Sequence, residues 1–116
     1  MLDELKLKVN FYRAESGTEP VRVWLQSLSK NDKKIIGEDI KTVQFAWPLG
    51  LPLIRKIETN LWEVRSNIEN KIARVLFTVI DDHMILLHGF IKKSQKIPKD
   101  DIHLAKKRYI NLRSRI

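Results

Sequence analysis

The alternation of hydrophobic and polar residues predicts a β-strand at the start of the chain. Leu5, Leu7, Val9 and Phe11 alternate with polar residues over positions 5 to 12, which is the period of two typical of a strand with one buried face. The runs LIRKIE, LWEVRS, KIARVLFTVI and MILLHGFIKK predict four further strands, separated by short polar turns. Consecutive hairpins among these strands indicate a mostly antiparallel sheet.

Three helices are predicted outside the strands. Pro20 suits the first turn of a short helix over about 20 to 28, where a missing N–H removes no hydrogen bond. Ser29 can cap a second helix, in which apolar residues recur four, three and four positions apart before Pro48 ends it. Pro98 opens a last helix with two acids in its first turn. The 116 residues therefore predict one α+β domain, spanning 1–116, with helices covering one face of the sheet.

The register of the later strands depends on the lengths assumed for two loops. A four-residue loop pairs Ser66 with Lys71, and a three-residue loop pairs Ile80 with Met84. One face of the sheet is then apolar and comprises Trp62, Val64, Ala73, Val75, Phe77, Val79, Ile85, Leu87, Gly89 and Ile91. A slip of one residue would scramble this face, so its apolarity supports the assumed loops.

The opposite, uncovered face is predicted to carry the side chains that are suited to binding or catalysis. In the same register it comprises Leu61, Glu63, Arg65, Ile72, Arg74, Leu76, His88, Phe90 and Lys92. Glu63 is predicted to lie directly across from Arg74, and Arg74 across from Phe90. The positive edge is extended by Lys93, Lys96 and Lys99. Guanidinium groups can hold phosphates in bidentate fashion while a base stacks on an aromatic ring, so this face is a candidate RNA-binding surface.

Each member of this face also has a structural interpretation. Glu63 and Arg74 can be a simple cross-strand ion pair, and His88 an ordinary sheet histidine. The KKSQK run, taken alone, is typical of a solvated charged segment. The spread of Trp24, Trp47 and Trp62 favours helix or sheet cores over a base-stacking platform.

Charge and composition favour a nucleic-acid partner. The formal charge of +8 and the pI near 9.9 attract polyanions. A membrane partner is disfavoured because no apolar run approaches the roughly 20 residues that span a bilayer, and the start lacks the order of a signal peptide, so we expect a cytoplasmic protein. The chain has no cysteine, and its three histidines match no common metal motif. No metal or cofactor is therefore expected.

Several segments resemble a known toxin family. LWEVR, RVLF and LLHGFIKKSQKIP followed by Ala105, together with FYRAESGTEPVRVWLQSLS, resemble the phage-derived HigB-like toxins of the RelE/ParE superfamily over roughly residues 7 to 113. The resemblance implies a RelE-like fold: a twisted, mostly antiparallel sheet of about five strands with two N-terminal helices and one C-terminal helix. It also implies a type II toxin that inhibits translation by cutting mRNA in the A site of the 70S ribosome. Its partner would be a HigA-like helix-turn-helix antitoxin.

The resemblance implies a metal-independent endoribonuclease, in which the 2′-hydroxyl attacks the adjacent phosphate. By this resemblance, Arg65 and Arg74 are expected to stabilise the transition state. The residues expected to bind RNA are Lys92, Lys93, Lys96, Phe90 and Lys99. Lys93 is also a candidate for proton transfer. Glu63 and His88 are acid–base candidates from their facing geometry, with His103 a further one. Tyr109 lies too far along the last helix to match the tyrosine that some relatives use.

Two other functions remain open from the residues. A basic domain can bind RNA or a partner protein without cutting anything, and it would share the salt dependence of RNA binding. A gyrase poison similar to ParE can be built on the same fold.

Overall fold

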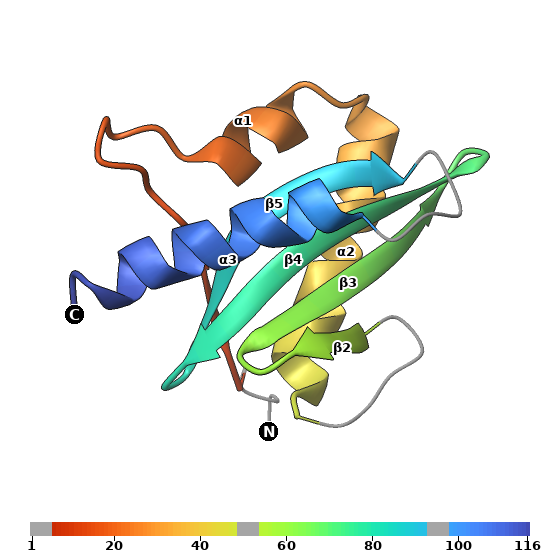
Figure 1. Ribbon diagram of the computed structural model, residues 1–116. Coiled ribbons are helices and arrows are strands. Elements are labelled where there is room, and N and C mark those ends of the chain that lie inside the picture. The colour runs from red at the N-terminus through yellow and green to blue at the C-terminus, as the bar shows by residue number, and fades with distance from the viewer. Residues whose placement is uncertain (1–5, 49–53, 93–97) are drawn as a thin grey trace.

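The computed structural model describes residues 6–48, 54–92 and 98–116, which form a five-stranded sheet and three helices (Figure 1). In chain order the elements are β1 (Lys8–Phe11), α1 (Pro20–Gln26), α2 (Lys30–Ala46), β2 (Ile54–Glu58), β3 (Leu61–Ile68), β4 (Lys71–Ile80), β5 (His83–Lys92) and α3 (Lys99–Arg113). Among the described residues, no helix combines the length and apolarity needed to cross a bilayer. The predicted α+β class is confirmed.

The sheet is mixed and has the strand order β1-β5-β4-β3-β2. The pairs β2–β3, β3–β4 and β4–β5 are antiparallel. β1 runs parallel to β5, with Lys8 opposite His83 and Phe11 opposite Leu86. β1 therefore extends the sheet beside β5, at the edge opposite β2.

The helix starts follow from local chemistry, as predicted. The Ser29 hydroxyl accepts a hydrogen bond of 3.1 Å from the backbone N–H of Asp32, which caps α2. Pro20 occupies the first turn of α1. The first turn of α3 carries Asp100 and Asp101, whose charges complement the positive end of the helix dipole.

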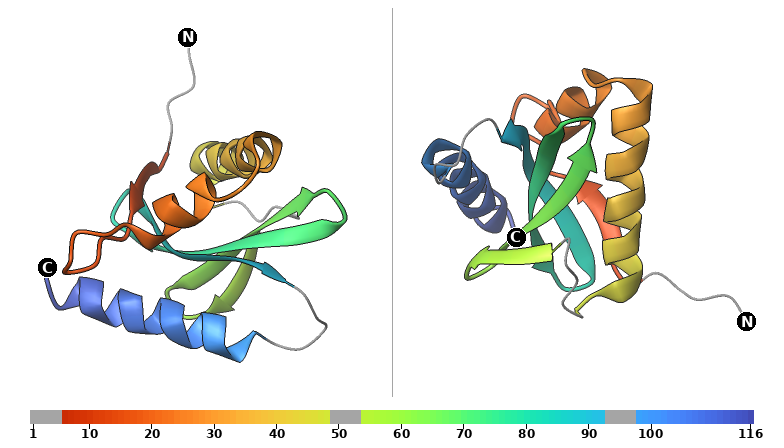
Figure 2. Two further views of the ribbon diagram at one scale, coloured as in Figure 1. Left: turned by 90° about the horizontal axis from the view of Figure 1, so that it is seen from above. Right: turned by 90° about the vertical axis from the view of Figure 1, so that its right-hand side faces the viewer.

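Helices cover both faces of the sheet, so the prediction that they cover one face is wrong (Figure 2). α1 and α2 pack on the first face around a core of Val64, Ala73, Val75, Phe77, Met84 and Leu86, against which all three tryptophans also pack. α3 packs on the second face around Tyr12, Leu61, Leu76, Ile85, Leu87 and Ala105. The apolar stripe of α3 needs a surface to cover, and this second cluster supplies it.

The β3–β4 turn is shorter than predicted. Ile68 pairs with Lys71 across a two-residue turn, and Asn70 at its second position has φ +54°. Ser66 consequently lies opposite Ala73 and not opposite Lys71. A shift of two residues keeps every side chain on its predicted face, because the side-chain period of a strand is two.

The β4–β5 pairing contains a β-bulge that the sequence did not predict. Ile80 pairs with His83 and not with Met84, and the register changes between Leu76 and Phe77. Beyond the bulge the predicted pairing of Arg74 with Phe90 is confirmed. In the first half of β5, Ile85 and Leu87 lie under α3, on the opposite face from the predicted one. Met84 and Leu86 occupy the first core in their place.

Candidate functional site: a cationic cleft under the start of α3

A cleft of about 420 Å³ opens on the face that α3 covers only in part. Strands β2 to β5 contribute its floor and rim, and the start of α3 contributes one wall. We refer to it as the cationic cleft. Its lining residues are Arg55, Ile57, Glu58, Glu63, Arg74, Lys92, Pro98 and Ile102. The Glu58 carboxylate forms an ion pair with Lys106 of α3, which does not line the cleft, at 3.1 Å.

A buried ion pair forms the floor of the cleft. The Arg74 Nη1 donates to Glu63 Oε2 at 2.9 Å, and the two side chains are only 4% and 1% exposed. Arg74 was predicted directly across from Glu63 on a solvent face. It instead lies across from Arg65, while Glu63 lies across from Leu76, so the pair bridges two rows of the sheet. The prediction of an uncovered face is wrong here, because both side chains are buried, on the face where the start of α3 also lies.

Arg65 completes a group of three charges. Arg65 and Arg74 point to the same side of the sheet, as predicted, and the Arg65 Nε lies 3.9 Å from Glu63 Oε1. The Arg65 side chain is 39% exposed, so it reaches from the buried pair towards solvent. One carboxylate thus sits between two guanidinium groups, and this group carries a net positive charge.

Three polar atoms in this group make no hydrogen bond with any described residue. They are Glu63 Oε1, Arg65 Nε and Arg74 Nε, and all three are buried. Buried polar atoms are nearly always paired in folded proteins, because an unpaired one loses its hydration without compensation. The buried ion pair and the neighbouring Arg65 therefore leave one acceptor and two donors without a partner among the described residues.

Two further cations stand at the rim. Arg55 in β2 is exposed and pairs in register with Glu63, which puts it on the same face. Lys92 ends β5 and is half-buried. Arg55 was not predicted as a site residue. Pairing LIRKIE with LWEVR as a hairpin would have identified it, because that register places Arg55 opposite Glu63.

His88 and Phe90 are next to the cleft but do not line it, and Phe90 pairs in register with Arg74. Their rings stack at 5.6 Å between centroids with 17° between planes. His88 Nε2 lies 2.7 Å from Asp101 Oδ1, and its Nδ1 lies 3.4 Å from Arg108 Nη1, both on α3. Phe90 packs against the second cluster. The structure thus brings Glu63, Arg65, Arg74 and Lys92 together and engages His88 with α3.

The remaining predicted residues are distributed along α3 or outside the described ranges. Lys99 is exposed at the first position of α3, and His103 is exposed one turn later. Tyr109 packs in the second cluster. Lys93 and Lys96 lie outside the described residues, so their roles stay predictions.

Comparison with known families identifies the chain. The family model described as phage-derived protein Gp49-like (DUF891) matches residues 23–110, which is more than half of the sequence. The chain belongs to the Gp49-like family. This family is one of RelE/HigB-like toxins. No curated protein matches the chain.

The matched segment of this Gp49-like protein contains the whole cleft. Every lining residue, from Arg55 to Ile102, falls within 23–110, as does Arg65. Chemically, the floor offers a carboxylate oxygen and guanidinium donors, and the rim offers an arginine and a lysine. The cations of such a set are suited to hold an anion.

Proposed function

We propose that this Gp49-like protein is the toxin of a type II toxin–antitoxin pair and acts as a ribosome-dependent mRNA endoribonuclease. The observation that carries the proposal is the floor of the cationic cleft, where one carboxylate lies between two guanidinium groups. The overall charge of +8 supports a polyanionic substrate. The family's toxin character supports the same reading.

The proposed reaction uses no metal ion. The 2′-hydroxyl of one nucleotide attacks the adjacent phosphorus, the bond to the 5′-oxygen of the next nucleotide breaks, and the products carry a 2′,3′-cyclic phosphate and a 5′-hydroxyl. Negative charge builds on the phosphorane oxygens, and preorganised donors that face this charge lower the barrier. Arg65 and Arg74 take this role in the proposal, while Arg55 and Lys92 hold the flanking phosphates.

Glu63 is the candidate general base. Its Oε1 accepts no hydrogen bond from the described residues, but it is buried, so this role requires that RNA binding open the floor of the cleft to the 2′-hydroxyl. Lys93, which follows Lys92 in the sequence, stays a predicted candidate for proton transfer. A HigA-like antitoxin and the ribosomal A site are the proposed partners. Acidic groups on an antitoxin would complement the cationic cleft if it binds there.

A second candidate function is RNA binding without cleavage. It is favoured by the burial of Arg74, whose Nη1 already donates to Glu63, as expected of a purely structural ion pair. In that case the exposed cations Arg55 and Arg65 would bind phosphate, and no bond would break.

Cleavage mapping separates these functions. The purified protein is added to a translation system reconstituted with mRNA, with and without ribosomes, and cut sites are mapped by primer extension. We expect cuts only when ribosomes are present. Arg65→Ala should cut much less than Lys56→Ala. Lys56 is the control because it lies opposite Trp62, on the other face of the sheet. Salt-sensitive RNA binding without cuts would establish the second candidate. Breaks in DNA in the presence of gyrase would establish a ParE-like poison.

A further inference from the structure

The contacts of His88 with α3 favour one assignment of its ring proton. A guanidinium group has only donors, so the Arg108 Nη1 at 3.4 Å favours the tautomer in which His88 Nδ1 is an acceptor. The Nε2 then carries the hydrogen and donates it to Asp101 Oδ1 at 2.7 Å. Both ring nitrogens are therefore engaged by α3, and the side chain is only 16% exposed. A general base needs a free ring nitrogen facing the substrate, which this arrangement does not provide.

The β-bulge aims His88 at α3. Leu87 and His88 both face Leu76 in β4, and so both side chains project from the α3 side of the sheet. Asp101 and Arg108 are seven residues apart, two helical turns, and thus lie on one side of α3. Arg108 Nη1 also donates to the backbone oxygen of Leu87 at 2.8 Å. Burial lowers the pKa of the Arg108 guanidinium, with a smaller opposing effect of Tyr12.

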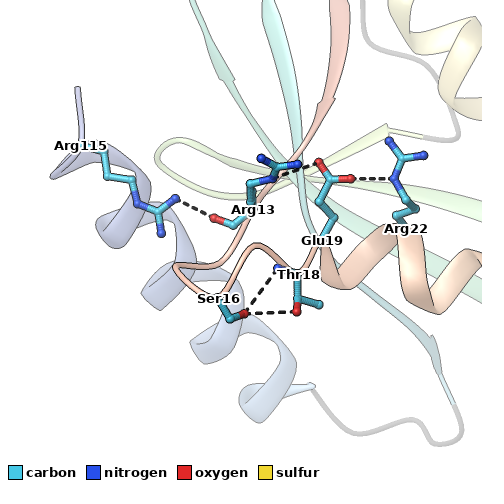
Figure 3. A network of polar contacts seen from close by, with 6 residues as sticks. All are labelled: Arg13, Ser16, Thr18, Glu19, Arg22 and Arg115. Carbon is cyan, nitrogen blue, oxygen red and sulfur yellow. Dashed lines mark hydrogen bonds and ion pairs between the residues drawn. The ribbon is translucent and has the colours of Figure 1, made fainter.

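The far end of α3 has its own attachment. Tyr12 Oη donates to Asn111 Oδ1 at 2.9 Å. Figure 3 shows a second contact, in which Arg115 Nη1 donates to the backbone oxygen of Arg13 at 2.6 Å. The Arg13 side chain lies 3.9 Å from Glu19, in the segment that leads into α1. The C-terminal turns are thereby held to the β1–α1 connection, independently of His88.

In the described part of the chain, the first turn of α3 meets the sheet through the apolar packing of Ile102 and through one polar side-chain contact, from Asp101 to His88. The N-cap position is Pro98, whose side chain makes no capping hydrogen bond. Asp101 is half-buried and contacts His88, while its neighbours Pro98 and Ile102 line the cationic cleft. The contact between Asp101 and His88 is thus the polar part of what positions this wall of the cleft, beside the apolar packing of Ile102.

We propose that His88 and Asp101 form a latch that holds the first turn of α3 against the cationic cleft. His88 is then a positioning residue that acts through Asp101, and it transfers no proton to or from RNA. The consequence for catalysis rests on the proposed function, whereas the consequence for the position of α3 does not. Small displacements of groups that surround reacting atoms cost about 10- to 100-fold in rate.

The test compares His88→Ala, His88→Gln, Asp101→Ala and the double alanine variant, with His83→Ala as the matched control, because His83 lies at the other end of β5, opposite Ile80. A glutamine can donate from its amide nitrogen to Asp101 but cannot act as a base. We expect both single alanine variants to lose about 10- to 100-fold in kcat/KM for ribosome-dependent cleavage. The double variant should lose no more than either, and His88→Gln should recover most of the activity, since a shared contact is lost only once. Glutamine as inactive as alanine, or additive losses, would overturn the latch.

Amide hydrogen exchange gives a readout that needs no catalysis. Both single alanine variants should exchange faster over residues 99–105 and keep wild-type protection over residues 109–113, where Tyr12 and Arg13 hold the helix. Unchanged exchange over residues 99–105 would overturn the latch even if the protein cleaves mRNA. Faster exchange in a protein that cleaves nothing would sustain the latch and refute the endoribonuclease.

Discussion

Removal of Arg74 tests whether the floor of the cleft is the buried ion pair described above. In Arg74→Met the Glu63 carboxylate stays 1% exposed and loses its hydrogen bond of 2.9 Å. Its remaining cationic neighbour is Arg65, at 3.9 Å. Loss of one partner of a buried pair costs about 3–5 kcal/mol, because an uncompensated charge remains out of water.

This cost converts into a large change in melting temperature. An unfolding entropy of about 2.1 cal/mol/K per residue gives about 0.24 kcal/mol/K for 116 residues. The melting temperature of Arg74→Met should therefore fall by about 12–20 °C, measured by circular dichroism or calorimetry. The double variant Glu63→Leu/Arg74→Met should lie within about 4 °C of wild type, since no buried charge is left unpaired.

An exposed ion pair provides the control. Lys8 and Asp82 lie 3.5 Å apart with side chains 70% and 54% exposed. Lys8→Met should change the stability by less than about 1 kcal/mol, which is a shift of under about 4 °C. If Arg74→Met also melts within this range, the pair is solvated and the proposed preorganised floor does not exist.

Three further outcomes are expected from the packing and charge of particular residues. Arg55→Ala should make the salt dependence of single-stranded RNA binding shallower by about 0.7 in log–log slope, whereas Lys56→Ala should not; equal slopes would remove Arg55 from the binding surface. Gly89→Ala should destabilise the protein by about 1–3 kcal/mol in urea unfolding, because its new Cβ would lie 2.3 Å from Trp24 Cε3, and unchanged stability would contradict this close packing. Ser29→Ala should cost about 1 kcal/mol by the same assay and Ser29→Asp much less, since aspartate also caps; equal losses would argue against the cap.

Local chemistry made much of the fold predictable. Ser29, Pro20 and Pro98 mark the starts of the helices because their side chains favour or tolerate the first turn. The faces of β3 and β4 were also predictable despite the wrong turn length, since an error of two residues preserves the alternation. Glu63, Arg65 and Arg74 were therefore assigned to the correct face.

Tertiary features were not predictable from the same patterns. The bulge between Leu76 and Phe77 adds one residue to β5, and no local composition marks it, so Ile85 and Leu87 were assigned to the wrong face. The position of α3 depends on a second apolar cluster that only this bulge completes. The burial of Arg74 follows from that position, which is why the sequence predicted an open surface where the protein has a cleft.

The proposed cleavage of mRNA on the ribosome depends on the charged side chains at the floor of the cationic cleft. Its most direct test is the rate of ribosome-dependent mRNA cleavage by Glu63→Leu/Arg74→Met, the double variant expected to keep the wild-type fold. Loss of one preorganised charged donor costs about 100-fold or more, so the variant should cut more than about 100-fold more slowly than wild type while melting at nearly the same temperature. Cleavage by this folded variant at the wild-type rate would contradict the claim.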